Sequence, residues 1–437
     1  MDFPPRLIVG IDIGKGSADY ALLASSGQIL EPHRAFVNSL DGFRQAKQLL
    51  LETFQAYPLS GLDIAVEATS YYWLPLYLQL SQDPELAAYA PRLALLNAGW
   101  VKWFKKSFAP DHKSDQRDPF YIAERLRTLR QPSWWSYDPH WLRLRLLTRL
   151  RFHLAHSLSR EKTHYQLFLF LAYSGYSRLK PFADPFGWTS QAVLAQPELL
   201  EEWRDLPVEE LARQLDQVSG GRLPDPAQVA DKLARALQES YPVPEELDPS
   251  LRSALRHLAQ LVHLLQQQVD QVEGEIAALC QAEPYPEVGW LDSIPGVALV
   301  EASGLAAEIA GIARFAAPPK YDPHRKADRA RNARDIEDAV AKFAGLWWPR
   351  NASGQFEAQE RPLSRRGNAY LRYYLLLAAD RMRLHIPSYT RYYQTKFREV
   401  SKHQHKRALV LTGRKAVGLI VGLLHHQEDY RPEEGAS

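Results

Sequence analysis

The stretch LIVGIDIGKGSADYALLASSGQIL, residues 7–30, predicts the first hairpin of a β-sheet. An apolar run ends at Asp12, a glycine-rich turn follows at 14–16, and a second apolar run leads into another turn at 25–27. Runs of aliphatic residues separated by glycine-rich turns are typical of paired antiparallel strands. The carboxylate of Asp12 therefore stands where the first strand gives way to its turn.

Strands and helices alternate after this hairpin. The sequence predicts a helix over 40–56, a strand over 62–69 (LDIAVEAT), a helix near 72–81 and a short strand over 93–97 (LALLN). This alternation is typical of an α/β domain with a partly parallel sheet. Glu67 lies near the end of one predicted strand, and the carboxyl ends of parallel strands meet at the edge where α/β proteins form their sites.

The rest of the chain is expected to be helical. Residues 118–172 are rich in arginine, tryptophan and leucine, and residues 175–250 form an acidic segment interrupted by prolines, which predicts an insertion of short helices. Residues 251–279 carry apolar side chains in a 4-3 spacing through four heptads, which predicts a coiled coil. The partner of this helix is either its copy in a second subunit or an earlier helix of the chain, such as 141–172.

These features predict a fold that is α/β plus all-α, in three parts. We expect an α/β catalytic domain over residues 1–135 and a helical, coiled-coil region over 136–285 that contains the acidic insertion at about 175–250. A helical C-terminal domain is expected over 286–437.

The composition excludes several classes of protein. Cys280 is the only cysteine, which rules out an internal disulfide and a four-thiolate zinc site and suggests a reducing compartment. No apolar run approaches the ~18 residues that a membrane span needs. The N-terminus lacks the pattern of a signal peptide. We therefore expect a cytoplasmic protein without a membrane segment.

Charge is segregated along the chain, although the net charge is only +2. Residues 102–160 hold 13 lysines and arginines against 5 acidic residues, and residues 361–415 hold 14 against 2. Residues 184–250 reverse the balance, with 5 against 14. Solvated helix faces are the ordinary alternative, but such blocks favour two segments that bind nucleic acid and one that avoids it.

Four carboxylates are candidates for a metal site. Asp12 and Glu67 end predicted strands, and Asp115 and Asp118 lie in HKSDQRD (112–118), where a helix is expected to begin. Helix positions three apart share a face, so the last two carboxylates can point at one centre. Clustered carboxylates repel one another unless divalent cations lie between them, and oxygen ligands suit Mg²⁺ or Mn²⁺. Two such ions about 4 Å apart activate a nucleophile and stabilise the leaving oxygen of a phosphodiester.

Each of these carboxylates also has a structural explanation. Asp12 is suited to cap a turn, Glu67 to pair with a lysine, and Asp115 or Asp118 to cap a helix. The combination of all four with a basic neighbourhood favours the metal site.

These motifs resemble the DEDD transposases of insertion elements (insertion-sequence family 110), which are bridge-RNA-guided DNA recombinases. The N-terminal half carries the resemblance in VGIDIGK around Asp12, VEAT around Glu67, LLNAGWVKWF around Asn97, and KSDQRD around Asp115 and Asp118. The C-terminal half carries it in SIPGVALVEASGLAAEI (293–309), KFAGLWWPRNASG (342–354), RRGNAYLR (365–372) and ALVLTGRKAVGLIVGLL (408–424). Residues 175–250 lie outside the resemblance.

The resemblance implies a specific enzyme. Its N-terminal domain would have a RuvC-like ribonuclease-H fold, with Asp12, Glu67, Asp115 and Asp118 as a catalytic tetrad that binds Mg²⁺ or Mn²⁺. Its C-terminal helical domain would supply a nucleophilic serine, which falls on Ser353 in NASGQF. Ser364 and then Ser303 are the rival nucleophiles. The implied partners are donor and target DNA and an element-encoded non-coding bridge RNA, bound by a dimer that pairs into a tetramer on DNA.

The basic segments supply the candidate nucleic-acid contacts. Arginines near Ser353 can stabilise charge on a pentavalent phosphorus. Aromatic residues among the arginines of 120–160 can stack on unpaired bases, although core positions explain the tryptophans better. The candidate nucleic-acid-binding residues are Lys113, Arg117, Arg350, Arg365, Arg366, Arg372, Arg414 and Lys415.

Three other functions compete with the recombinase. A RuvC-like endonuclease would resolve DNA junctions by metal-assisted attack of water, and Ser353 would then be structural. An actin-like sugar kinase would share the hairpin over 7–30, but it would need a second phosphate loop and an adenosine motif that the sequence lacks. A non-catalytic nucleic-acid scaffold would be indifferent to both Ser353 and Mg²⁺.

Overall fold

A computed structural model describes most of the chain. The described residues are 5–67, 71–108, 117–129, 132, 134–135, 138–194, 196–316, 319–322, 327–349, 352–353, 356–357, 361–364 and 366–432. The chain divides into two compact units, Met1–Pro139 and His140–Ser437.

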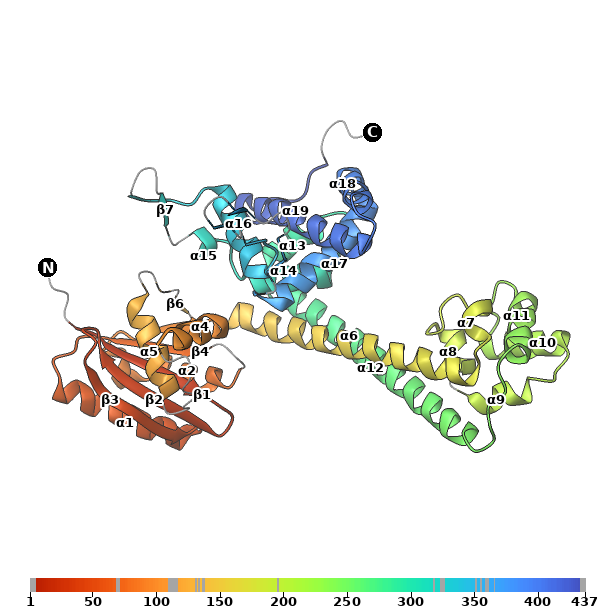
Figure 1. Cartoon of the computed structure of the whole chain (residues 1–437), viewed down its shortest axis with the longest axis horizontal. Helices are drawn as coiled ribbons and strands as arrows, with labels where there is room; N and C mark the ends of the chain where they lie inside the picture. The colour runs from red at the N-terminus through yellow and green to blue at the C-terminus, as the bar shows by residue number, and fades with distance from the viewer. Residues whose placement is uncertain are drawn as a thin grey trace. The chain divides into compact units, whose positions relative to one another are not determined.

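The first unit is built on a mixed six-stranded sheet of order β3-β2-β1-β4-β5-β6 (Figure 1). The strands are β1 (Leu7–Ile13), β2 (Ser17–Ala24), β3 (Ile29–Val37), β4 (Leu62–Glu67), β5 (Arg92–Leu96) and β6 (Trp134–Trp135). β1 and β2 form the predicted antiparallel hairpin, and β3 extends it. β4 lies parallel to β1 and β5 parallel to β4, which confirms a partly parallel sheet. The segment 118–172 was expected to be helical throughout, but Trp134–Trp135 adds an edge strand to β5.

Helices cover both faces of this sheet. They are α1 (Leu40–Ala56), α2 (Trp73–Gln82), α3 (Pro84–Ala87), α4 (Ala98–Phe108) and α5 (Asp118–Thr128). Successive strand residues point to opposite faces, so Leu7, Val9 and Ile11 pack with α1 and α2. Ile8 packs with α4 and α5 on the other face. The predicted helices over 40–56 and near 72–81 are confirmed.

The predicted coiled-coil helix finds its partner within the chain. α12 (Asp248–Ala282) runs antiparallel to α6 (Pro139–Ala172), and the two lie side by side (Figure 1). Leu158 of α6 packs against Val262 and Val269 of α12. Nearer the other end of the pair, Arg151 and Glu273 form an ion pair of 2.8 Å. The intramolecular alternative is therefore confirmed.

The acidic segment forms a small helical lobe with a core of its own. Its helices are α7 (Tyr176–Leu179), α8 (Trp188–Leu194), α9 (Pro197–Glu202), α10 (Val208–Ser219) and α11 (Pro226–Gln238). The fully buried indole of Trp203 lies in this core, which also takes in Leu169 of α6 and Leu255 of α12. The expected insertion of short helices is confirmed.

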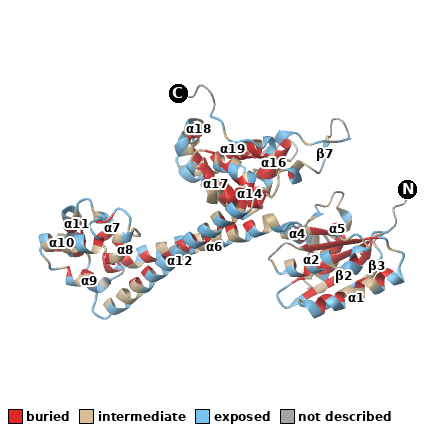
Figure 2. Cartoon of the chain, turned by 180° about the vertical axis from the view of Figure 1, so that it is seen from behind, coloured by how far each residue is buried: buried red, intermediate tan, exposed pale blue. Residues whose placement is uncertain are grey.

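The C-terminal part is a helical bundle with two short hairpins. It contains α13 (Pro286–Asp292), α14 (Leu299–Ile309), α15 (Ala313–Ala316), α16 (Ala333–Ala344), α17 (Ala369–His385), α18 (Pro387–Arg398) and α19 (Gln404–His426). The hairpins pair β7 (Lys320–Asp322) with β8 (Ala327–Arg329), and β9 (Ala352–Ser353) with β10 (Phe356–Glu357). The bundle core is continuous through α14, α17 and α19, as the buried residues in Figure 2 show.

One helix of this bundle, α19, is unusually apolar. By length and composition alone, Gln404–His426 (α19) could cross a membrane, with a mean hydropathy of 1.5 in its most apolar window. Half of that window is buried inside the bundle. Core helices of water-soluble domains pass the same test, so α19 is weak evidence for a membrane segment.

Candidate active site

The pairing of β1 with β4 brings two of the predicted carboxylates to one edge of the sheet. The parallel register aligns Ile11 with Val66. Asp12 and Glu67 directly follow these two residues, so they lie side by side where both strands end. The expectation that the strand-end carboxylates share one edge is met for this pair.

A glycine in β1 lets a helix deliver the third carboxylate. A Cβ atom at Gly10 would lie 2.0 Å from the carbonyl oxygen of Pro119 and 2.4 Å from the backbone nitrogen of Ala123. Because no side chain intervenes, α5 lies directly against the strand. Asp118, the first residue of α5, is thereby held close enough to Glu67 for its charge to raise the pKa of that carboxyl group.

A lysine that was not among the predicted site residues lies among these carboxylates, and it confirms the structural alternative in which Glu67 pairs with a lysine. The Lys105 ammonium is 2.7 Å from Oδ2 of Asp118 and 3.8 Å from Oε2 of Glu67. It comes from α4, whose first turn is capped by Asn97: the Asn97 side-chain oxygen accepts hydrogen bonds from the backbone of Gly99 and Trp100. One feature of the sequence could have pointed to Lys105. This lysine lies in the helix that directly follows a predicted strand, and this helix carries no acidic residue.

The pKa of Glu67 is shifted by its burial and by the charges of its neighbours. Burial raises its pKa, and the negative charges of Asp12 and Asp118 raise it further, whereas Lys105 lowers it. The net shift of this pKa is upward, and burial is its largest cause. Three carboxylates gathered near one ammonium carry more negative charge than that ammonium neutralises. A site of this kind is suited to a more highly charged cation.

The described carboxylates offer the oxygen ligands that a divalent ion prefers, but they do not by themselves complete its coordination. Within the described ranges, no group of three or more His, Cys, Asp or Glu side chains has the geometry to hold a metal. The Lys105 ammonium lies between Asp118 and Glu67, where a cation would be bound. Asp115, the fourth predicted ligand, lies outside the described residues.

The predicted nucleophile belongs to a short hairpin in the second unit. Ser353 ends β9, and its backbone pairs with Phe356 of β10, but its side chain lies outside the described part of the structure. Among the rivals, Ser303 is completely buried in α14, which makes it unsuitable for attack on DNA. Ser364 is half-buried, and its hydroxyl accepts a hydrogen bond from the backbone of Arg366.

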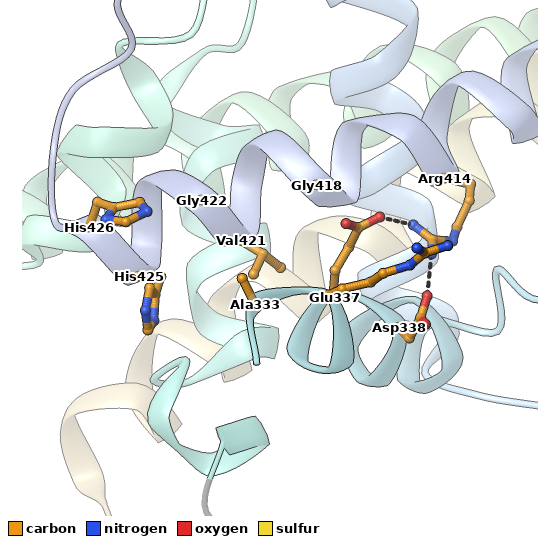
Figure 3. A pocket seen from close by; sticks show the side chains of 10 residues that line it. Ala333, Glu337, Asp338, Arg414, Gly418, Val421, Gly422, His425 and His426 are labelled. Atoms are coloured by element: carbon orange, nitrogen blue, oxygen red, sulfur yellow. Dashed lines mark hydrogen bonds and ion pairs between the residues drawn. The ribbon is translucent and has the colours of Figure 1, made fainter. Parts of the chain in front are cut away.

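Two of the candidate nucleic-acid-binding cations, Arg372 and Arg414, make contacts within the protein itself. Arg372 donates a hydrogen bond to the carbonyl of Ala344. Arg414 forms ion pairs with Glu337 and Asp338 across a groove between α16 and α19, as Figure 3 shows.

The remaining candidate nucleic-acid-binding residues differ in their surroundings. Lys415 lies over the rings of Tyr389 and Tyr392, at 4.6 and 4.9 Å from their centroids. Arg117 and Arg366 are exposed. The three that lie outside the described residues are Lys113, Arg350 and Arg365.

Comparison with known proteins identifies both halves of the chain. Residues 9–173 match the family model of IS110-type DEDD transposases. Residues 328–394 match the model of the transposase IS116/IS110/IS902 family. No curated protein matches the chain.

The carboxylates at the sheet edge and these two matches define a transposase, an enzyme that cuts and joins DNA strands. The two matches together span more than half of the 437 residues and support the assignment of the chain to the IS110 family. The mixed sheet of the first unit is consistent with the RuvC-like fold of this family. DEDD transposases generally depend on divalent metal ions.

The position of Lys105 leads to a test of metal binding. Replacing Lys105 by methionine should increase the apparent affinity for Mg²⁺ about tenfold or more, because a positive charge within about 4 Å of a cation costs roughly 1–4 kcal/mol at the dielectric of a protein surface. The Mg²⁺ concentration that gives half of the thermal stabilisation is the measurement. Lys102→Met removes an exposed charge from the same helix and serves as the control. An unchanged midpoint in Lys105→Met would show that Mg²⁺ binds elsewhere.

Proposed function

We propose that this transposase cleaves and rejoins donor and target DNA through a covalent phosphoserine on Ser353. The observation that carries the proposal is that Asp12 and Glu67 lie side by side at the end of the sheet, while Glu67 and Asp118 share the ammonium of Lys105. The rest of the tetrad and the serine follow from the resemblance of KSDQRD and NASGQF to the family motifs.

The residues of the chain have distinct parts in this reaction. The Ser353 hydroxyl loses its proton and attacks a DNA phosphorus, which forms a serine–phosphate ester and breaks one bond to a deoxyribose oxygen. The displaced oxygen takes up a proton and leaves as a hydroxyl group. Attack by a hydroxyl from another strand reverses these steps, so strands are exchanged without an external energy source. Serine is a weak nucleophile at neutral pH, so a general base or a metal ion must activate its hydroxyl group.

Asp12, Glu67, Asp115 and Asp118 would hold Mg²⁺, with Mn²⁺ as an alternative. When bound, the metal would supply charge stabilisation for the attacking and leaving oxygens. Without the metal, Lys105 partly neutralises Glu67 and Asp118 and so lowers the repulsion between them.

Guidance by an element-encoded bridge RNA is the second part of the proposal. It is supported by the resemblance and by the basic blocks at 102–160 and 361–415. Guide pairing would supply sequence specificity that the protein need not read itself. Recombination of two duplexes needs at least two active sites, so we propose a dimer that pairs into a tetramer on DNA. Because the heptad seam of α12 is occupied by α6, the subunit contacts would use other surfaces.

A covalent-trapping assay tests this function. The protein is incubated with its RNA, labelled donor and target DNA and Mg²⁺, quenched in denaturant and separated on a protein gel. Label should migrate with the wild type and with Ser364→Ala, but with neither Ser353→Ala nor Asp12→Ala. Trapping that survives in Ser353→Ala would move the nucleophile elsewhere. Cleaved DNA without any covalent species would leave a RuvC-like nuclease that uses water.

A further inference from the structure

Helix α4 presents two tryptophans to solvent beside the carboxylate cluster. Trp100 is 60% exposed and Trp103 is 57% exposed. Residues three apart on a helix are neighbours, so the two indoles lie on one outer face. The same helix directs Lys105 inward to Asp118. One face of α4 thus contacts the site, and another offers a large aromatic surface.

The surroundings of the tryptophans are cationic and polar. Lys102, Lys106 and Ser107 are exposed, and α4 contains no acidic residue. A protein–protein interface is expected to have an apolar centre depleted in lysine. Indole rings next to lysines are instead suited to a single-stranded nucleic acid. Its unpaired bases can stack on the rings, and its phosphates can contact the lysines.

We propose that Trp100 and Trp103 stack on unpaired bases of the DNA strand next to the cleaved phosphodiester, with Lys102 and Lys106 contacting its phosphates. Each base offers a ring face whatever its identity, so the contact is independent of sequence. A strand held on α4 passes the carboxylate cluster, because Lys105 links the helix to that cluster. The inference rests on the transposase acting on DNA, and it adds a surface for single-stranded DNA within the first unit.

Equilibrium binding of a labelled oligodeoxythymidine, measured by fluorescence anisotropy in EDTA, tests the proposal. Trp100→Ala/Trp103→Ala should bind about tenfold or more weakly than the wild type, since each base stacked on an aromatic ring contributes strongly to affinity. The matching change to phenylalanine should retain most of the affinity, whereas leucine should not, because leucine preserves only the apolar character. Trp188→Ala is the control: Trp188 is 59% exposed in α8, with Arg222 over its ring.

Several results would overturn the proposal. Equal binding by the alanine variant and the wild type would do so, and so would equal loss in Trp188→Ala. Full retention of DNA binding by the leucine variant would show that the contact needs only apolar surface and no stacking on bases. Loss confined to a single-stranded RNA probe would assign the surface to RNA.

This experiment is separate from the test of phosphoserine chemistry. Binding in EDTA requires neither Ser353 nor a metal ion. A protein that binds single-stranded DNA through α4 but traps none would refute the proposed chemistry and leave the surface established. The alanine variant could instead trap DNA normally at saturating DNA and bind the oligonucleotide with unaltered affinity. That result would refute only the proposed DNA-binding surface on α4.

Discussion

Replacing Gly10 by alanine is expected to displace α5 and abolish DNA cleavage. The added Cβ atom would lie 2.0 Å from the Pro119 carbonyl oxygen and 2.4 Å from the Ala123 nitrogen. Both are backbone atoms, so no side-chain rotation relieves the clash, and the helix itself must shift. Overpacking of a well-ordered core costs about 1–3 kcal/mol and occasionally more.

The same substitution should act on the site through Asp118. This residue begins α5, and its contact with Lys105 depends on how closely the helix approaches β1. Urea unfolding would measure the stability loss, and the DNA-trapping assay would measure the loss of activity. Gly16→Ala is the matched control in the same hairpin, because a Cβ atom there has no neighbour within 4 Å. A Gly10→Ala protein of normal stability and activity would show that α5 does not need this close approach.

The sequence was informative about the sheet because its strands obey simple local rules. Apolar runs separated by glycine-rich turns over 7–30, and the ends of the strands at Asp12 and Glu67, placed two carboxylates at one edge. Lys105 escaped prediction because its role depends on the angle at which α4 leaves β5. That angle results from packing across the sheet face, and a helix without acidic residues after a strand end does not reveal it.

The coiled coil shows a second limit of sequence reasoning. The heptad spacing over 251–279 identified the buried stripe of α12, because the spacing depends only on the geometry of one helix. It did not identify the partner, since α6 presents a mixture of arginines and leucines instead of a matching seam. Ion pairs such as Arg151–Glu273 help to align the two helices, and these were visible only in three dimensions.

Charge counts were least informative about individual residues. The excess of cations over 361–415 is real, yet Arg414 and Arg372 make contacts within the bundle. A count treats every cation as exposed, whereas long side chains often reach back to carboxylates and helix ends. Sequence alone therefore located a basic region but not the side chains available to DNA.

Glu308→Gln is expected to destabilise the C-terminal bundle by about 3–5 kcal/mol, the usual cost of removing one partner from a buried ion pair. Glu308 is 1% exposed. Its carboxylate accepts hydrogen bonds from Arg149 at 2.6 and 2.8 Å and from the Asn368 side chain at 2.5 Å. Asn368 in turn caps α17. One carboxylate therefore ties α6, α14 and the start of α17 together, directly after the segment that contains Ser353.

The loss in Glu308→Gln should depend on pH. Burial would raise the pKa of Glu308, but the Arg149 ion pair and the Asn368 hydrogen bond outweigh burial and lower it. A carboxyl group with a lowered pKa stabilises the folded state above its ordinary pKa, and this contribution is lost as the pH falls. Urea unfolding at neutral pH should therefore separate wild type from Glu308→Gln by more than unfolding at acidic pH. Equal separation at both values would show that the charge of Glu308 is not the cause.

Two further variants isolate the ion pair from general damage to the bundle. Glu210→Gln removes a carboxylate from an exposed pair with Arg213, and exposed pairs contribute only about 0–1 kcal/mol. Arg149→Met combined with Glu308→Leu removes both charges of the pair, while Arg145 and Arg314 keep their hydrogen bonds to the carbonyl oxygens of Ala307 and Glu308. Replacing a buried pair by apolar residues of similar volume is often neutral or stabilising, so this double variant should recover most of the lost stability. A double variant no more stable than Glu308→Gln would mean that the geometry at Asn368, and not the buried charge, supports this part of the bundle.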